Sequence, residues 1–121
     1  MIEHSALAYL ATPFSLQPDR WRATIRAAQI ASDLIRAGVN VFAPIAHGYL
    51  MTRWDDLDPL DAALWERINA PFLKVCDVLI VAQMEGWEES KGMAHEIAVF
   101  EKAGKPIFDL DPITLKMVKR P

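Results

Sequence analysis

The sequence has a single cysteine, Cys76, which excludes an internal disulfide and any metal site built from several cysteines. It also lacks long hydrophobic runs: no stretch approaches the roughly 18 apolar residues of a membrane-spanning helix. The N-terminus has no basic region followed by an apolar one, as a secretion signal would have. We therefore expect a cytoplasmic protein with no membrane partner. Because Cys76 directly precedes an apolar run, we expect it to be a small buried hydrophobic residue.

Positive charge is not in excess either. The chain has 13 basic and 16 acidic residues, a formal net charge of −3, and its basic residues are scattered. We therefore expect no nucleic-acid polymer as a partner. Its 3 histidines share no ligand spacing, so no metal ion is expected. No G-x-G-x-x-G or Walker loop is present, and we expect no cofactor.

What the sequence does contain is a regular alternation of apolar runs and amphipathic segments. With 121 residues, 52% hydrophobic and 24% charged, it is long enough for one core, so we expect a single domain over residues 1–121. The pattern predicts strands at 6–11, 39–44, 77–83 and 106–110. It predicts helices at 19–37, from Pro59 onward and at 90–103, and a last helical turn or two within 112–120. Pro71 should kink or restart the second of these helices, and a long loop is expected at 45–58. This order predicts an α/β flavodoxin- or Rossmann-like three-layer sandwich with a doubly wound, mainly parallel sheet of four to five strands.

Ligands of such folds bind at the carboxyl ends of the strands. Three segments follow predicted strands there: Thr12–Ser15, the loop that contains His47, and Glu85–Ser90. We expect them to surround one crevice. For His47, a ligand contact and a purely structural role in its loop are equally compatible with the pattern.

One predicted helix places a glutamate, Glu96, among residues that would pack inward. Gly92 lies one turn earlier, and helical side chains lean toward the N-terminus, so the Glu96 carboxylate would overlook a position with no side chain. Ser90 is a good N-cap, and the free N–H groups behind it can hold an anion. From these residues alone, Glu96 is either a solvated surface charge or a reactive group beside a ligand.

Four segments in order, AYLATPFS, VFAPIAHG, CDVLIVAQ and ESKGMAHEIAVFEKAGKPI, resemble the nucleoside 2-deoxyribosyltransferase superfamily and, within it, a bacterial branch of the DUF1937 type. The resemblance implies that Glu96 is the nucleophile that attacks the anomeric carbon and expels the base. It also implies that Tyr9 orients or tunes this glutamate. A carboxylate suits this chemistry because cleavage passes through an oxocarbenium-like state.

Two positions indicate which relatives the chain resembles. Deoxyribosyltransferases that act on free nucleosides have an aspartate six residues before the nucleophile, at the position of Ser90, where it contacts the sugar. Ser90 resembles the deoxynucleoside 5′-monophosphate N-glycosidases, in which a serine contacts the phosphate, although Glu88 and Glu89 beside it would repel one. Asn69 stands where the family usually has the aspartate that protonates the leaving base, and an amide cannot do so. A substitute acid would come from Asp61, Glu66 or His47.

The resemblance implies a small-molecule nucleoside or nucleotide as partner and a homo-oligomer, a dimer or a tetramer. We expect the substrate to contact Thr12, Pro13, Phe14, His47, Trp87, Ser90 and Gly92, with Phe14, Trp54 and Trp87 able to stack on a base. His95 should point away from Glu96 toward the surface or an interface, and Trp21 and Trp65 should belong to the core or an interface. Asp77 is expected to be structural.

The expected function is cleavage of the N-glycosidic bond of a (deoxy)nucleoside or its 5′-monophosphate, with hydrolysis or transfer of the sugar. Two alternatives stay open. Asn69 is compatible with a non-catalytic nucleotide-binding or sensor module on the same fold. An NAD-cleaving enzyme of the TIR type would share a lone catalytic glutamate, but no other feature of the sequence favours it.

Overall fold

The structure is a computed structural model that describes residues 2–121. Its elements in chain order are β1 (Leu7–Ala11), α1 (Arg20–Arg36), β2 (Asn40–Phe42), α2 (Pro44–Gly48), η1 (Tyr49–Arg53), α3 (Ala62–Val75), β3 (Val78–Ala82), η2 (Trp87–Glu89), α4 (Lys91–Ala103), β4 (Ile107–Leu110) and β5 (Met117–Lys119), where η marks a 3-10 helix. No helix within residues 2–121 has the length and apolar character needed to cross a membrane.

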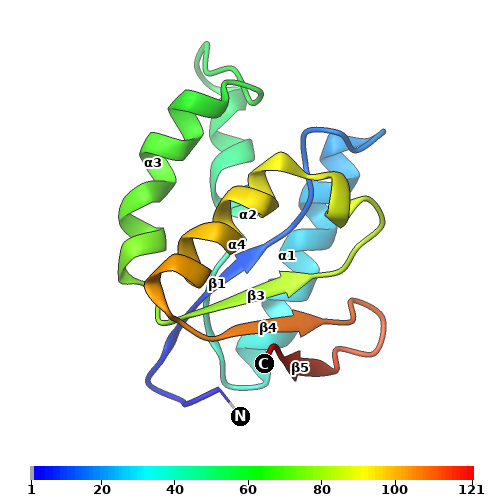
Figure 1. Ribbon diagram of the computed structural model, residues 1–121. Coiled ribbons are helices and arrows are strands. Elements are labelled where there is room, and N and C mark those ends of the chain that lie inside the picture. The colour runs from blue at the N-terminus through cyan, green and yellow to red at the C-terminus, as the bar shows by residue number, and fades with distance from the viewer. Residues whose placement is uncertain (1) are drawn as a thin grey trace.

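The strands form one sheet in the order β2-β1-β3-β4-β5 (Figure 1). The first four are parallel, and β5 pairs antiparallel with β4. The chain leaves β1 to one side to form β2 and then crosses to the other side to form β3. The strand order therefore reverses between β1 and β3, which is where doubly wound sheets bind ligands at their carboxyl edge. The predicted fold class is confirmed.

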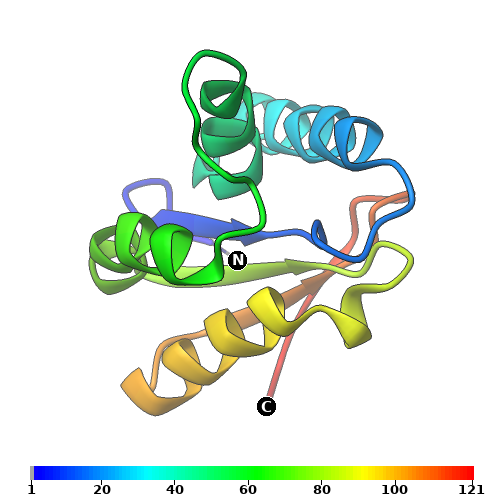
Figure 2. The same cartoon turned by 90° about the horizontal axis from the view of Figure 1, so that it is seen from above.

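Alternation along β1 divides the core between the two faces of the sheet. Ala8 and Leu10 join the apolar cluster under α1, whereas Tyr9 and Ala11 join the cluster under α3 and α4. Figure 2 shows α1 on one side of the sheet and α4 on the other. All residues of β3 are buried, as expected for a central parallel strand. The register of β1 therefore directs Tyr9 toward the α4 side.

Side-chain caps fix the starts of the three long helices. Asp19 caps α1, Asp61 caps α3 and Ser90 caps α4, each accepting a backbone N–H three residues further on. Gly104 ends α4 with a φ of 68°, a left-handed conformation that favours glycine. The predictions for α1 and α4 are confirmed. The third helix begins at Ala62 rather than Pro59 and runs through Pro71 without restarting.

The long loop expected at 45–58 is partly helical. The second strand ends at Phe42, and Pro44 opens the short helix α2, which is followed by η1. Proline is favourable at a first helical position because its missing N–H would be unbonded there anyway. The prediction of a strand to residue 44 and an irregular loop was therefore wrong.

The C-terminal segment is a strand, not the predicted helical turns. Asp111 Oδ1 accepts the backbone N–H groups of Ile113 and Thr114, and Leu115 follows with a φ of 63°. This turn reverses the chain so that β5 covers the free edge of β4. Arg120 then donates to both carboxylate oxygens of Asp109, with its Nη2 2.9 Å from Oδ1. The edge hydrogen bonds and this pair favour a strand over a helix.

The expected roles of Cys76 and Asp77 are confirmed. Cys76 is 1% exposed, and burial raises the pKa of its thiol to about 11. Asp77 Oδ2 accepts the backbone N–H of Leu7 at 2.8 Å, and the Asp77 N–H donates to the Leu7 carbonyl at 2.8 Å. Asp77 therefore ties the start of β3 to the start of β1.

Candidate active site

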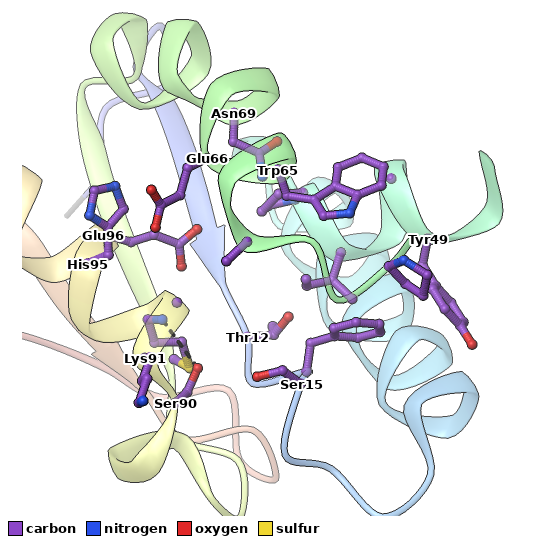
Figure 3. Close-up of a pocket in the computed structure, with 18 of the residues that line it drawn as sticks. Thr12, Ser15, Tyr49, Trp65, Glu66, Asn69, Ser90, Lys91, His95 and Glu96 are labelled. Carbon is purple, nitrogen blue, oxygen red and sulfur yellow. Dashed lines mark hydrogen bonds between the residues drawn. The ribbon is translucent and has the colours of Figure 1, made fainter. Parts of the chain in front are cut away.

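A cavity of about 550 Å³ lies at the carboxyl edge of the sheet. Its walls come from the segment after β1, from α2 and η1, from α3 and from the first turns of α4 (Figure 3). This is the crevice expected at the point where the strand order reverses. Its volume is in the range of small-molecule sites.

The α4 wall carries Ser90, Gly92 and Glu96. Ser90 is buried, and its Oγ accepts the Met93 N–H at 3.2 Å, which fixes the start of the helix. A Cβ built on Gly92 would meet only the Ser90 Oγ, at 3.9 Å, so no protein atom requires a glycine there. Gly92 leaves open space in front of Glu96, as the spacing predicted.

Glu96 and Tyr9 form the electrostatic centre of the cavity. Glu96 is partly buried, and loss of hydration raises the pKa of its carboxyl to about 8, while the nearby Tyr9 hydroxyl opposes this rise. Tyr9 is fully buried, and burial followed by the Glu96 charge raises the pKa of its phenol well above its usual value. Tyr9 therefore remains a hydrogen-bond donor beside a carboxyl that is easily protonated.

Two buried hydroxyls at the cavity have no hydrogen-bond partner among residues 2–121. They are Tyr9 Oη and Thr12 Oγ1, on residues that are 0% and 4% exposed. Leaving a buried polar group unpaired costs about 1–3 kcal/mol, so each such group needs an explanation, of which a role at a functional site is one. Both residues line the cavity, so a ligand bound there would lie close to these hydroxyls.

The facing wall comes from α3. Asn69 and Glu66 are three residues apart on this helix and both line the cavity. Figure 3 shows the Glu66 side chain directed toward the α4 side, where Glu96 lies. Asp61, by contrast, lies outside the cavity lining, and its carboxylate accepts the Leu64 N–H at 3.1 Å. Of the three proposed substitute acids, only Glu66 reaches the cavity.

Aromatic rings form the end of the cavity farthest from Glu96 in Figure 3. Phe14 packs edge-on against Tyr49, with 5.0 Å between ring centroids. Trp65 also lines the cavity and donates its indole N–H to the Asp58 carbonyl at 2.9 Å. Phe14 was predicted here, whereas Trp65 was assigned to the core or an interface. Tyr49 was not anticipated, because no periodicity signalled η1.

Four residues expected at the crevice do not line it. His47 lies on the opposite side of α2, with its ring centroid 5.3 Å from that of Phe42.

Trp87 packs on the apolar cluster beneath α4, with the Arg120 guanidinium 6.0 Å above its ring. Pro13 is buried between the two lining residues Thr12 and Phe14, and Trp54 is 73% exposed. None of these four lines the cavity, and their contact with a substrate stays a prediction.

His95 was expected to point away from the site, yet it lines the cavity. Gly92, His95 and Glu96 are spaced i, i+3 and i+4, so they share one side of α4. That spacing was present in the sequence and predicts the placement. Lys91 is a further lining residue from the same turn, and Glu88 and Glu89 lie outside the lining.

Comparisons with known proteins agree with this architecture. The family model described as "Domain of unknown function (DUF1937)" matches residues 6–111, and the chain belongs to this family. A solved structure of a 2-deoxyribosyltransferase from Bacillus psychrosaccharolyticus is similar in fold, with a TM-score of 0.55 and 22% sequence identity over 88% of this chain and 73% of that chain. Among curated proteins there is no match.

Proposed function

We propose that this DUF1937 chain cleaves the N-glycosidic bond of a (deoxy)nucleoside or its 5′-monophosphate, with Glu96 as nucleophile. One observation carries the proposal: Glu96 faces open space beside two buried hydroxyls without partners, in a cavity at the switch point of the sheet. The fold shared with a 2-deoxyribosyltransferase is consistent with glycosyl transfer.

In the first step, a Glu96 carboxylate oxygen attacks the anomeric carbon of the sugar. The bond between that carbon and the base nitrogen breaks, and its electron pair leaves with the base. In the second step, water or another base attacks the glycosyl-enzyme and regenerates the carboxylate, giving hydrolysis or transfer. The charge of Glu96 stabilises the oxocarbenium-like transition states of both steps.

Tyr9 has the chemistry of a tuning residue. Its hydroxyl lies beside Glu96, where it favours the ionised form and lowers the pKa of that carboxyl. Burial raises the pKa of Glu96 to about 8, so the free protein near neutral pH holds Glu96 largely protonated. We expect kcat/KM to rise with pH up to about 8, because only the carboxylate is nucleophilic.

The two ends of the cavity differ in chemistry, which suits a nucleoside or nucleotide. Phe14 and Trp65 offer apolar ring surface for a base. Ser90 and Lys91, at the N-terminus of α4, offer a hydroxyl, a cation and helix N–H groups for a 5′-phosphate. With Glu88 and Glu89 outside the lining, their carboxylates oppose phosphate binding less than the sequence alone indicates.

A second candidate function is nucleotide binding without turnover, which the amide of Asn69 favours. The two functions predict different outcomes in one experiment. Purified protein is incubated with deoxynucleosides, ribonucleosides and their 5′-monophosphates, and release of free base is followed by chromatography. We expect release by the wild type and by Glu101→Ala, an exposed control on the same helix, and none by Glu96→Ala.

If the wild type releases no base, yet one of these compounds raises its melting temperature, the binding function replaces the catalytic one. Release that persists in Glu96→Ala would remove Glu96 as the nucleophile. A preference for monophosphates would support phosphate contact at Ser90, and Ser90→Asp should then shift the preference toward nucleosides.

We also propose that the chain self-associates, as the resemblance implies. Large apolar side chains near η1 are exposed, namely Leu50 (48%), Met51 (41%) and Trp54 (73%). Sedimentation equilibrium of the wild type and of Trp54→Arg tests this proposal. A wild-type protein that is monomeric over the whole concentration range would refute it.

A further inference from the structure

The proposed reaction leaves one requirement unmet. A departing nucleobase carries the electron pair of the broken bond and needs a proton, because the anion of an unprotonated purine or pyrimidine is a poor leaving group. Asn69, on the α3 wall, offers only an amide, which donates a hydrogen bond but cannot give up a proton at ordinary pH. Some other titratable group must supply it.

Position decides among the cavity-lining groups. In a displacement at the anomeric carbon the nucleophile and the leaving group lie on opposite sides of that carbon, so an acid must face Glu96 rather than adjoin it. Lys91 and His95 share α4 with Glu96. Tyr9 adjoins Glu96, since the charge of Glu96 raises the pKa of its phenol. These three lie on the nucleophile's side.

Two titratable groups remain among the lining residues within 2–121. Tyr49 packs between Phe14 and Trp21, and Figure 3 shows its hydroxyl pointing away from Glu96. Glu66 lies on α3, one turn before Asn69, and its side chain is directed toward Glu96 in Figure 3. Within residues 2–121 the Glu66 carboxylate makes no side-chain hydrogen bond or ion pair, so no structural role holds it there.

We propose, on the basis of the proposed function, that Glu66 is the general acid that protonates the leaving base, a role that the amide of Asn69 cannot fill. The Glu66 carboxyl gives its proton to a base nitrogen as the glycosidic bond breaks and Glu96 bonds to the anomeric carbon. Glu66 is then a carboxylate. In hydrolysis it takes a proton from the water that attacks the glycosyl-enzyme, and both carboxyl groups return to their starting states.

The test compares two leaving groups of nearly the same shape. 2′-Deoxyguanosine needs protonation of its base, whereas 7-methyl-2′-deoxyguanosine carries a positive charge and leaves as a neutral base without an added proton. Both are used as nucleosides and as 5′-monophosphates, with base release measured for the wild type, Glu66→Gln, Glu96→Ala and the exposed control Glu101→Gln. Glu66 is itself exposed in the free protein, so glutamine should leave the fold intact, and a melting curve of each variant checks this.

We expect Glu66→Gln to lower kcat/KM for 2′-deoxyguanosine about 10²- to 10⁴-fold, the usual range for general acid catalysis. The same variant should cleave the methylated substrate within a few-fold of the wild type, which also proves that it is folded. Glu96→Ala should lose both substrates, and Glu101→Gln should keep both.

The outcomes separate the two proposals. A folded Glu66→Gln that loses both substrates equally, or keeps both, refutes the assignment of Glu66 and leaves the role of Glu96 standing. Should glutamine unfold the protein, Glu66→Ala and Glu66→Asp take its place under the same criterion. If, after subtraction of the spontaneous rate, the wild type cleaves neither substrate as a nucleoside or as a 5′-monophosphate, both the proposed function and the role of Glu66 are refuted.

Discussion

The unusual position of Glu96 predicts that removing its charge makes the protein more stable above neutral pH. In the folded protein burial raises the pKa of this carboxyl to about 8, from an ordinary value of 4.5. Between these two pH values the unfolded chain is ionised at residue 96 while the folded chain holds the proton. Folding therefore takes up a proton in this window, and the stability of the wild type falls as the pH rises through it. Glutamine at this position has no such dependence.

The size of the effect follows from the same two pKa values. At 1.36 kcal/mol for each pH unit, the rise from 4.5 to about 8 corresponds to at most about 5 kcal/mol at alkaline pH. The cavity opens to solvent and water can hydrate the carboxylate there, so we expect about half of this, roughly 2–3 kcal/mol. Near pH 4 the two proteins should differ by about 1 kcal/mol or less, because residue 96 is then neutral in both states.

Urea denaturation at several pH values measures this difference. The free energies of unfolding of Glu96→Gln and the wild type are compared from about pH 4 to about pH 9, so that groups common to both cancel. Glu101→Gln, on an exposed position of α4, is the control and should give a small difference that does not grow with pH. A difference that stays flat for Glu96→Gln as well would refute the reasoning, since Glu96 would then be an ordinary solvated carboxylate.

Three further predictions test neighbouring features. Tyr9→Phe removes the hydroxyl that lowers the pKa of Glu96, so the rising limb of the pH–rate profile should move to higher pH while folding stability is retained. A limb that does not move would show that Tyr9 does not tune Glu96. Gly92→Ala should raise the free energy of unfolding by up to about 1 kcal/mol, because alanine favours a helix more than glycine does. It should also raise KM, because the new methyl group enters the cavity, and an unchanged KM would contradict a ligand at that position. Asp77→Ala leaves the Leu7 N–H without its acceptor, so the free energy of unfolding should fall by about 1–3 kcal/mol in thermal or urea denaturation, with kcat unchanged. A comparable loss of kcat would contradict a purely structural role.

The parts of the fold that depend on local signals were predictable. Apolar runs located β1 and β3, and the caps Ser90 and Gly104 bounded α4 within a residue or two. The C-terminal strand was not predictable in this way. In the segment 112–120, Ile113, Leu115 and Met117 alternate with polar residues, but so short a pattern does not by itself decide between a strand and a helical turn. The strand β5 forms because the edge of β4 and the carboxylate of Asp109 are available to it. Such tertiary partners are invisible in a short window of sequence.

In the candidate site, too, the residues placed by local signals were predictable and those placed by tertiary packing were not. Gly92 and Glu96 could be placed from helix spacing, because Ser90 fixes where α4 begins and every later residue then has a known direction. The α3 wall had no comparable reference, since its helix begins three residues later than the sequence indicated and Leu73 packs it against the apolar cluster beneath it. That is why Asn69 could be placed only through the resemblance, while Trp65 was assigned elsewhere.

The separation of the two carboxylates onto different helices has a physical reason. If both lay on α4, they would lie on the same side of the substrate, and neither could face the other across it. With Glu96 on α4 and Glu66 on α3, each is held by a helix that packs on the sheet through its own apolar residues, Met93 for α4 and Leu73 for α3. The sheet therefore sets the distance between the proposed nucleophile and the proposed acid.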